Sequence, residues 1–199
     1  MHAIRGRRRT PRVAGMNAAL AHRAPIVRMA LGQGLRVSGL LPSSDGYLPV
    51  QGEGGQVTLP ACTDEEAAMV RWSVRRFGHA AAEHFLSTRG LTLLHEALSD
   101  VRGRWVRPLP AADIVGRARA GSDALCADVV AQCGGWIATI ASDLALTFGA
   151  FGGVYIEGPL ACELEPLLAS AAFRRRFEDK GRFASYLAKV PVYIADQCR

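Results

Sequence analysis

Residues 148–156, FGAFGGVYI, read as the end of a helix, a glycine turn and a buried strand. Ahead of them, the apolar positions of residues 123–148 recur at helical spacing, and Asp123 can cap the start of that helix. Behind them, residues 177–183, FEDKGRF, place two acids and two bases between phenylalanines, and the strand-like VPVYI follows at 190–194. A long helix followed by glycine-bounded strands predicts an α/β fold.

The first half of the chain predicts a meander of strands followed by helices. Three apolar runs are separated by two turns; the runs lie at 25–31, 35–40 and 47–50, and the turns at 32–34 and 43–46. Thr63 and Glu66 then have the spacing of a capping box, which marks the start of a helical region. We expect helices at about 63–77, 79–86, 91–98, 111–118 and 123–148.

Composition places the chain among ordinary globular proteins, since 49% of its 199 residues are hydrophobic and 21% are charged. The formal net charge of +6 is unevenly distributed. Residues 1–36 hold eight arginines and no acid, so the remaining 163 residues carry a net charge of −2. The basic character therefore belongs to the N-terminal region, and we expect residues 1–24 to be a disordered basic arm.

The cysteines and the apolar stretches help to predict the cellular compartment of the protein. The five cysteines show no metal-ligand spacing, and we expect free thiols in a reducing environment; they are residues 62, 126, 133, 162 and 198. No secretory signal follows the N-terminal arginines. The longest apolar stretch, 133–148, is shorter than the roughly 20 residues of a membrane span. These features predict a cytoplasmic protein without a membrane segment.

Two glycine-rich turns are candidates for binding. Glycines at 32 and 34 permit turns that aim backbone N–H groups at a phosphate, although a plain β-turn explains them equally well. In the segment 52–56, GEGGQ, Glu53 stands among glycines with its side chain free to accept hydrogen bonds from hydroxyl groups. Without further context Glu53 is also compatible with a solvated loop residue.

Together, the FGGVYI and FEDKGRF segments resemble the C-terminal half of the bacterial glucokinases. The resemblance covers residues 25–195 and implies a ribonuclease-H-like lobe of the actin/hexokinase type over residues 25–199, with a mixed β-sheet packed with helices. It also implies ATP-dependent phosphorylation of glucose to glucose 6-phosphate in the cytoplasm, with Mg²⁺ and in a homodimer. The charged residues of FEDKGRF we assign to structure rather than to catalysis.

The resemblance assigns sugar contacts to Glu53, Gln56 and Glu83. Residues 52–56 resemble the family's Gly-Glu-Gly-Gly-His segment, in which Gln56 replaces the histidine. Glu83 stands at the spacing of the family's second sugar-binding glutamate, and the Leu-Ser pair that follows it in the family is present here at 86–87. Gln56 retains hydrogen-bonding capacity but does not titrate.

The resemblance also implies an ATP site lined by Gly32, Gly34, Gly152, Gly153 and Gly158. The family's phosphate loop is Gly-Thr-Gly-Leu-Gly, and the chain departs from it at two positions; these are Gln33 and Arg36. The segment after the strand that ends at residue 156 departs from the family's adenosine motif at two further positions, Glu157 and Pro159. We expect the negative charge of Glu157 and the missing N–H of Pro159 to weaken ATP binding.

Two family motifs are absent from the sequence. These are the Asn-Asp-Phe segment, which carries the catalytic base, and the Asp-x-Gly-Gly-Thr loop for phosphates and metal. We therefore assign no catalytic residue and no metal ligand, and we interpret the chain as a truncated kinase.

Two other classes of function remain open. One is a catalytically silent sugar-binding or dimerising protein that uses Glu53 and Glu83 without phosphoryl transfer. The other is a nucleic-acid-binding module that acts through the arginines of residues 5–12, which the acidic body disfavours. A transcriptional repressor of the related sugar-kinase type is not expected, because no helix-turn-helix precedes the lobe.

Overall fold

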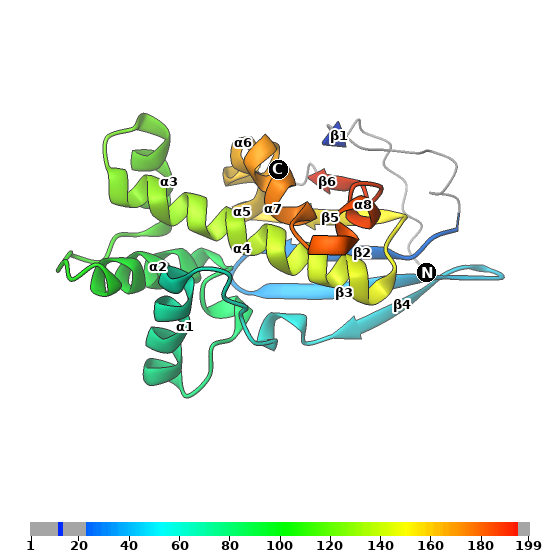
Figure 1. Ribbon diagram of the computed structural model, residues 1–199, viewed down its shortest axis with the longest axis horizontal. Coiled ribbons are helices and arrows are strands. Elements are labelled where there is room, and N and C mark those ends of the chain that lie inside the picture. The colour runs from blue at the N-terminus through cyan, green and yellow to red at the C-terminus, as the bar shows by residue number, and fades with distance from the viewer. Residues whose placement is uncertain (1–11, 14–22, 195–199) are drawn as a thin grey trace.

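The computed structural model describes residues 12–13 and 23–194 (Figure 1). Its strands are β1 (Arg12–Val13), β2 (Ile26–Leu31), β3 (Leu35–Ser43), β4 (Gly46–Gly52), β5 (Gly153–Glu157) and β6 (Val192–Ile194). Its helices are α1 (Asp64–Phe77), α2 (Thr88–Val101), α3 (Ala111–Ala120), α4 (Ala124–Phe148), α5 (Pro159–Glu163), α6 (Glu165–Leu168), α7 (Ala171–Glu178) and α8 (Ala184–Leu187). Three 3₁₀ turns complete them: η1 (Gly54–Gln56), η2 (Ala82–His84) and η3 (Gly181–Phe183).

All six strands form one mixed sheet in the order β1-β6-β5-β2-β3-β4. Strands β2, β3 and β4 pair antiparallel, as the predicted meander requires. Strand β5 returns parallel to β2, with Ile26 opposite Gly153, and β6 is parallel to β5. Helices α1–α4 form the connection between β4 and β5, so the fold is α/β as expected.

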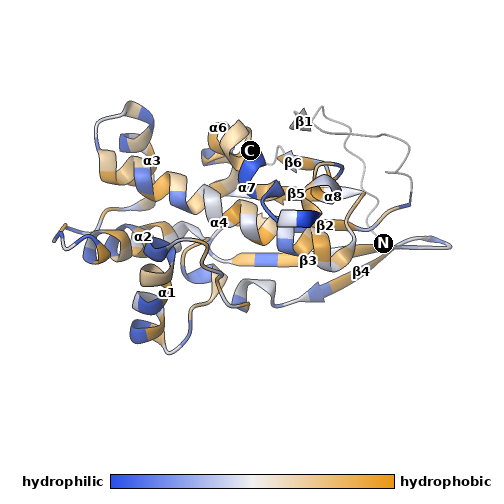
Figure 2. Cartoon of the chain, in the orientation of Figure 1, coloured by the Kyte–Doolittle hydropathy of each residue, from blue (hydrophilic) through white to orange (hydrophobic). Residues whose placement is uncertain are grey.

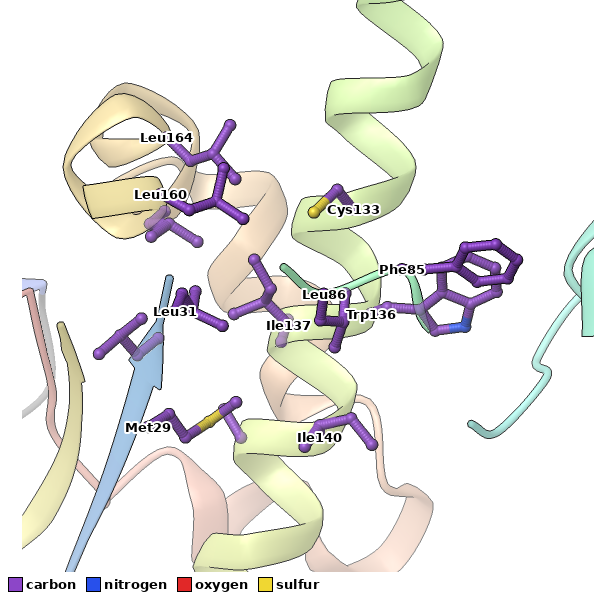
Figure 3. Close-up of a cluster of buried hydrophobic side chains, with 14 of the residues drawn as sticks. Met29, Leu31, Phe85, Leu86, Cys133, Trp136, Ile137, Ile140, Leu160 and Leu164 are labelled. Atoms are coloured by element: carbon purple, nitrogen blue, oxygen red, sulfur yellow. The ribbon is translucent and has the colours of Figure 1, made fainter. Parts of the chain in front are cut away.

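Helix α4 forms the centre of the core and confirms the helix expected at 123–148. The Asp123 side chain accepts a hydrogen bond from the Cys126 N–H, and Gly149 ends the helix with φ of 62°. Trp136 is fully buried; its ring stacks on Phe85 at 5.4 Å between centroids, and its Nε1 donates to the Pro60 carbonyl (Figure 3). The indole is therefore a core group whose one polar atom has a hydrogen-bond partner.

The apolar side of α4 faces the sheet. Met29 and Leu31 of β2 point toward α4, and Ile137 of the helix lies on the side that faces them (Figure 3). Hydrophobic residues run along both β2 and α4 (Figure 2). By length and mean hydropathy α4 could span a membrane, yet 61% of its most apolar window is buried inside the protein. Helix α4 is therefore the core helix of a globular fold.

The FEDKGRF segment spans the end of α7 and the turn η3, and its role here is structural. Phe177 is fully buried, and Glu178 is paired with Arg174. Lys180 donates to Asp143 of α4 at 2.6 Å. Glu178 thus stabilises α7 itself, and Lys180 connects the segment to α4.

The expectation of an arm at 1–24 stays open in part, and the expectation about the thiols needs correction. Within the arm expected at 1–24, Arg12–Val13 forms strand β1 beside β6. Residues 1–11 and 14–22, with most of the arginine cluster, lie outside the described part of the chain, so the arm and its boundary stay predictions.

The expectation of five free thiols is wrong at Cys162, which is disulfide-bonded. An odd number of cysteines excludes full pairing but still permits one disulfide. Cys62, Cys126 and Cys133 are free.

Candidate functional site

The carboxyl ends of the parallel strands β2 and β5 open onto one pocket. The turn 32–34 follows β2 and Gly158 follows β5, and both line a cavity of about 460 Å³. Gly158 has φ of 100°, and a Cβ there would lie 2.4 Å from the Leu31 carbonyl oxygen, so only glycine fits. The structure thus brings together three of the five glycines expected at the nucleotide, Gly32, Gly34 and Gly158, in the crevice where α/β folds bind ligands.

Gly152 and Gly153 lie at the opposite end of β5. Gly153 begins the five-residue strand and Gly158 follows its last residue, so the two ends lie roughly 15 Å apart at the usual rise. The Gly152 N–H donates to the Pro25 carbonyl, and a Cβ on Gly152 would lie 2.7 Å from the Ala24 carbonyl oxygen. Gly152 thus permits close packing against the start of β2, and a Cβ on Gly153 would lie 2.6 Å from the Tyr193 ring. The structure does not bring this glycine pair to the pocket.

Glu83 connects the glycine turn to the sugar loop. Its Oε2 accepts a hydrogen bond from the Leu35 N–H at 3.0 Å, directly after the turn. Its Oε1 accepts one from Gln56 Nε2 at 3.1 Å. The backbone of η2, which carries Glu83, is held to the same loop because the Ala82 N–H donates to the Val57 carbonyl at 2.9 Å. Two of the expected sugar contacts are therefore bonded to each other.

Glu53 precedes η1 and is exposed. Its side chain does not cap the turn, whereas its carbonyl accepts a hydrogen bond from the Gln56 N–H at 2.9 Å. The two glycines that follow let η1 lie flat on β3, since a Cβ on Gly55 would lie 2.2 Å from the Leu35 carbonyl oxygen. Gln56 thus joins the loop of Glu53 to the carboxylate of Glu83, and the Glu53 side chain stays available to a ligand.

The charges around the pocket differ from the expectation. Glu157 is paired with Arg28 of the neighbouring strand at 2.8 Å, and its side chain is only 14% exposed. Pro159 is the first residue of α5, where a backbone N–H has no partner within the helix. Arg36 lines the pocket, is exposed, and makes no ion pair with any described residue. Arg28 therefore neutralises the negative charge of Glu157, one of the two expected reasons for weakened ATP binding. The other, the missing N–H of Pro159, stays a prediction.

Three polar residues beside Glu83 have no motif in the sequence to mark them. His79 Nε2 lies 3.1 Å from the Gln56 carbonyl, and His84 Nδ1 lies 3.0 Å from Ser73 Oγ. Burial lowers the pKa of His84; the nearby His79 acts in the same direction and Glu83 opposes it. Sequence spacing could not have identified this cluster, because its contacts depend on how η2 packs against α1 and η1.

The pocket residues suit a phosphate but provide neither a base nor a metal site. Backbone N–H groups, glycines and the Arg36 guanidinium can accommodate an anion. No carboxylate lines the cavity. Among residues 12–13 and 23–194, no group of three or more histidine, cysteine, aspartate or glutamate side chains could hold a metal ion. A magnesium ion at this site would therefore be held by the phosphates of a nucleotide rather than by side chains of the described residues.

The chain resembles known proteins over nearly all of its length. The family model described as Glucokinase matches residues 3–197. The curated glucokinase of Aromatoleum aromaticum is 45% identical over 170 residues, which are 85% of this chain and 51% of the relative. The chain thus spans about half the length of the curated relatives it matches.

Solved structures agree with this relationship. A glucokinase from an Antarctic psychrotroph superposes with a TM-score of 0.85 at 27% identity and covers 94% of this chain and 58% of its own. The glucokinase of Balamuthia mandrillaris, solved in complex with glucose, shares the fold with a TM-score of 0.76 at 18% identity over 86% of this chain and 50% of its own. The chain belongs to the glucokinase family.

Proposed function

We propose that residues 25–199 form the lobe that binds glucose and the phosphates of ATP for phosphorylation of glucose at its 6-hydroxyl. The observation that carries this proposal is the position of Glu83, whose carboxylate accepts hydrogen bonds from both the sugar loop and the residue after the glycine turn. Cytoplasmic location and a homodimer remain predictions from the resemblance.

The sugar side of the proposal rests on free acceptor capacity. A carboxylate offers about four lone-pair sites, and Glu83 uses only two for Leu35 and Gln56. The exposed side chain of Glu53 uses none for η1. Both groups can accept hydrogen bonds from sugar hydroxyls, and the Gln56 amide can both donate and accept. This is the chemistry that distinguishes a polyhydroxylated ligand from an apolar one.

The nucleotide side rests on the pocket at the ends of β2 and β5. Gly32, Gly34 and Gly158 keep side chains out of the cavity, and Arg36 supplies a positive charge at its edge. ATP supplies the phosphoryl group that is transferred, and Mg²⁺ neutralises its charge. The chain's own residues position the phosphates with backbone N–H groups and orient the sugar.

Proton removal from the 6-hydroxyl needs a base, and the Asn-Asp-Phe segment that carries the family's base is absent from this sequence. We therefore propose that this 199-residue chain binds both ligands but transfers the phosphoryl group very slowly by itself. The second candidate, a catalytically silent sugar-binding protein, is favoured by the same observation and differs in transferring no phosphoryl group at all.

Calorimetry and a coupled ADP assay test the proposal with the full chain. We expect glucose to bind and raise the Tm, galactose to bind much less, and Glu53→Ala to weaken glucose binding by about tenfold or more. Glu165→Ala, which alters an exposed acid on α6, is the matched control and should bind glucose normally.

Each ligand result has a defined meaning. Binding of glucose and ATP with slow but measurable formation of ADP supports the proposal. Glucose binding with no ADP formed from ATP supports the silent protein. Absence of glucose binding contradicts the proposed function, and rapid formation of ADP contradicts the lack of a base.

A further inference from the structure

Glu83 occupies a position between two loops that a sugar contact alone would not require. Its Oε2 lies 3.0 Å from the N–H of Leu35, the first residue of β3 after the glycine turn. Its Oε1 lies 3.1 Å from the side-chain amide of Gln56 in the sugar loop. The phosphate loop and the sugar loop are therefore connected through the two oxygens of one carboxylate.

The glycine at position 34 is explained by this carboxylate. A Cβ on Gly34 would lie 2.5 Å from Glu83 Oε2 and 3.2 Å from its Cδ, and the three nearest heavy atoms beyond the chain neighbours all belong to Glu83. Gly34 does not have the positive φ that requires glycine. The absence of a side chain at position 34 thus lets the Glu83 carboxylate reach the Leu35 N–H.

The Leu35 backbone is fixed from the other side as well. Gly55 of the sugar loop packs so closely on Leu35 that a Cβ there would lie 2.2 Å from the Leu35 carbonyl oxygen. The N–H of Leu35 is held by Glu83 and its carbonyl is covered by Gly55, so the residue cannot shift without disturbing the sugar loop. The turn 32–34 immediately precedes it, with the Gly32 N–H donating to the Gly34 carbonyl at 3.0 Å.

We propose that Glu83 is a positioning residue that couples occupancy of the sugar site to the order of the phosphate loop at residues 32–34. This rests on the proposed function for the identity of the sugar. A hydroxyl group that donates to a remaining lone pair of Glu83 restricts rotation of the carboxylate. The restricted carboxylate holds the Leu35 N–H more persistently, which orders the loop before the nucleotide phosphates arrive. By linkage, phosphate binding then strengthens sugar binding by the same factor.

Amide hydrogen exchange at Leu35 measures the coupling directly in the full chain. We expect saturating glucose to slow exchange at Leu35 at least about fivefold. Glu83→Ala should accelerate exchange at Leu35 by about tenfold even without glucose, because the N–H loses its acceptor. A purely structural Glu83 would not make exchange at Leu35 depend on glucose.

A glycine substitution tests the same contact without changing Glu83. Gly34→Ala should displace the carboxylate, accelerate exchange at Leu35 and weaken glucose binding by about tenfold. Gly116→Ala, at an exposed position of α3, is the matched control, since a Cβ there would meet open space, and it should change neither quantity. In the Glu83→Ala background, Gly34→Ala should add no further acceleration, because the group it displaces is gone.

The outcomes separate this inference from the proposed function. Glucose binding with unchanged exchange at Leu35 overturns the coupling and leaves the proposed function intact. Equal effects of Gly34→Ala and Gly116→Ala also overturn it. If the wild-type chain does not bind glucose, both proposals fail, and exchange at Leu35 in Glu83→Ala then shows whether the link between the two loops exists on its own.

Discussion

His95 lies on the buried side of α2 with 1% of its surface exposed, and its Nδ1 has no hydrogen-bond partner among the described residues. Burial lowers the pKa of His95 most strongly; Asp123 and Glu96 raise it and Arg117 lowers it. The neutral imidazole is therefore the form that the fold accommodates. This single residue connects the stability of the helical region to pH.

The sign of the pH effect follows from the lowered pKa. Below about pH 6.5 the unfolded chain takes up a proton at His95 and the folded chain does not, so the free energy of unfolding falls as pH is lowered toward the folded pKa. We expect His95→Leu to reduce this fall, which is at most about 1.4 kcal/mol per pH unit for one group. Part should remain, because the pKa of His84 is also lowered. Urea unfolding at pH 7.5, 6.5 and 5.5 measures it, and identical slopes in both proteins would contradict the prediction.

Single residues also show where sequence reasoning about the site succeeds and fails. The resemblance identified Glu83 and Gln56, and the structure joins them by a hydrogen bond. It could not identify the role of Leu35, because a backbone N–H carries no sequence signal. Glu157 looked like a repulsive charge near a polyphosphate, and only the parallel pairing of β2 with β5 shows that Arg28 neutralises it.

At the scale of elements, one buried carboxylate holds three helices together. Glu66 of α1 accepts hydrogen bonds from Arg176 of α7 at 2.8 and 3.0 Å and from Gln132 of α4 at 2.9 Å. The predicted capping box is therefore only half formed: Thr63 accepts from the Glu66 N–H, but the Glu66 carboxylate accepts from the Cys62 N–H instead of returning to Thr63. Tertiary partners determined the direction of this side chain.

Removing Arg176 should strongly destabilise the protein. The Glu66 side chain is only 4% exposed, so Arg176→Met leaves a buried charge without its cation and should cost about 3–5 kcal/mol of unfolding free energy. The double variant with Glu66→Gln should recover at least half of that loss, because the uncompensated charge is removed. Arg175→Met, at an exposed position on the same helix, is the control. Chemical denaturation measures all four proteins, and equal losses for the two single arginine variants would contradict the role of the network.

At the scale of the whole molecule, the sequence predicted the elements better than their arrangement. The helical period of residues 123–148 and the cap at Asp123 are local signals, and α4 follows them closely. The sheet order is not local, since β2 pairs with β5 from more than 120 positions away. For the same reason the pair Gly152 and Gly153 was expected at the nucleotide, although strand direction places it at the other end of β5.

The sheet ends in an exposed strand, which predicts how the whole molecule behaves at high concentration. All seven residues of β4 are exposed, and the β3–β4 hairpin extends beyond the helices (Figure 1). Leu48 is 60% exposed and Val50 37% exposed. An unpaired apolar edge is a site for strand pairing between molecules.

Leu48→Lys should therefore reduce concentration-dependent self-association, because the added charge opposes edge-to-edge pairing. Gln51→Lys replaces a residue that is already polar and lies on the opposite side of the strand, so it should reduce self-association less. Sedimentation velocity over a range of concentrations compares them, and association unaffected by Leu48→Lys would show that the edge of β4 is not where the molecules meet.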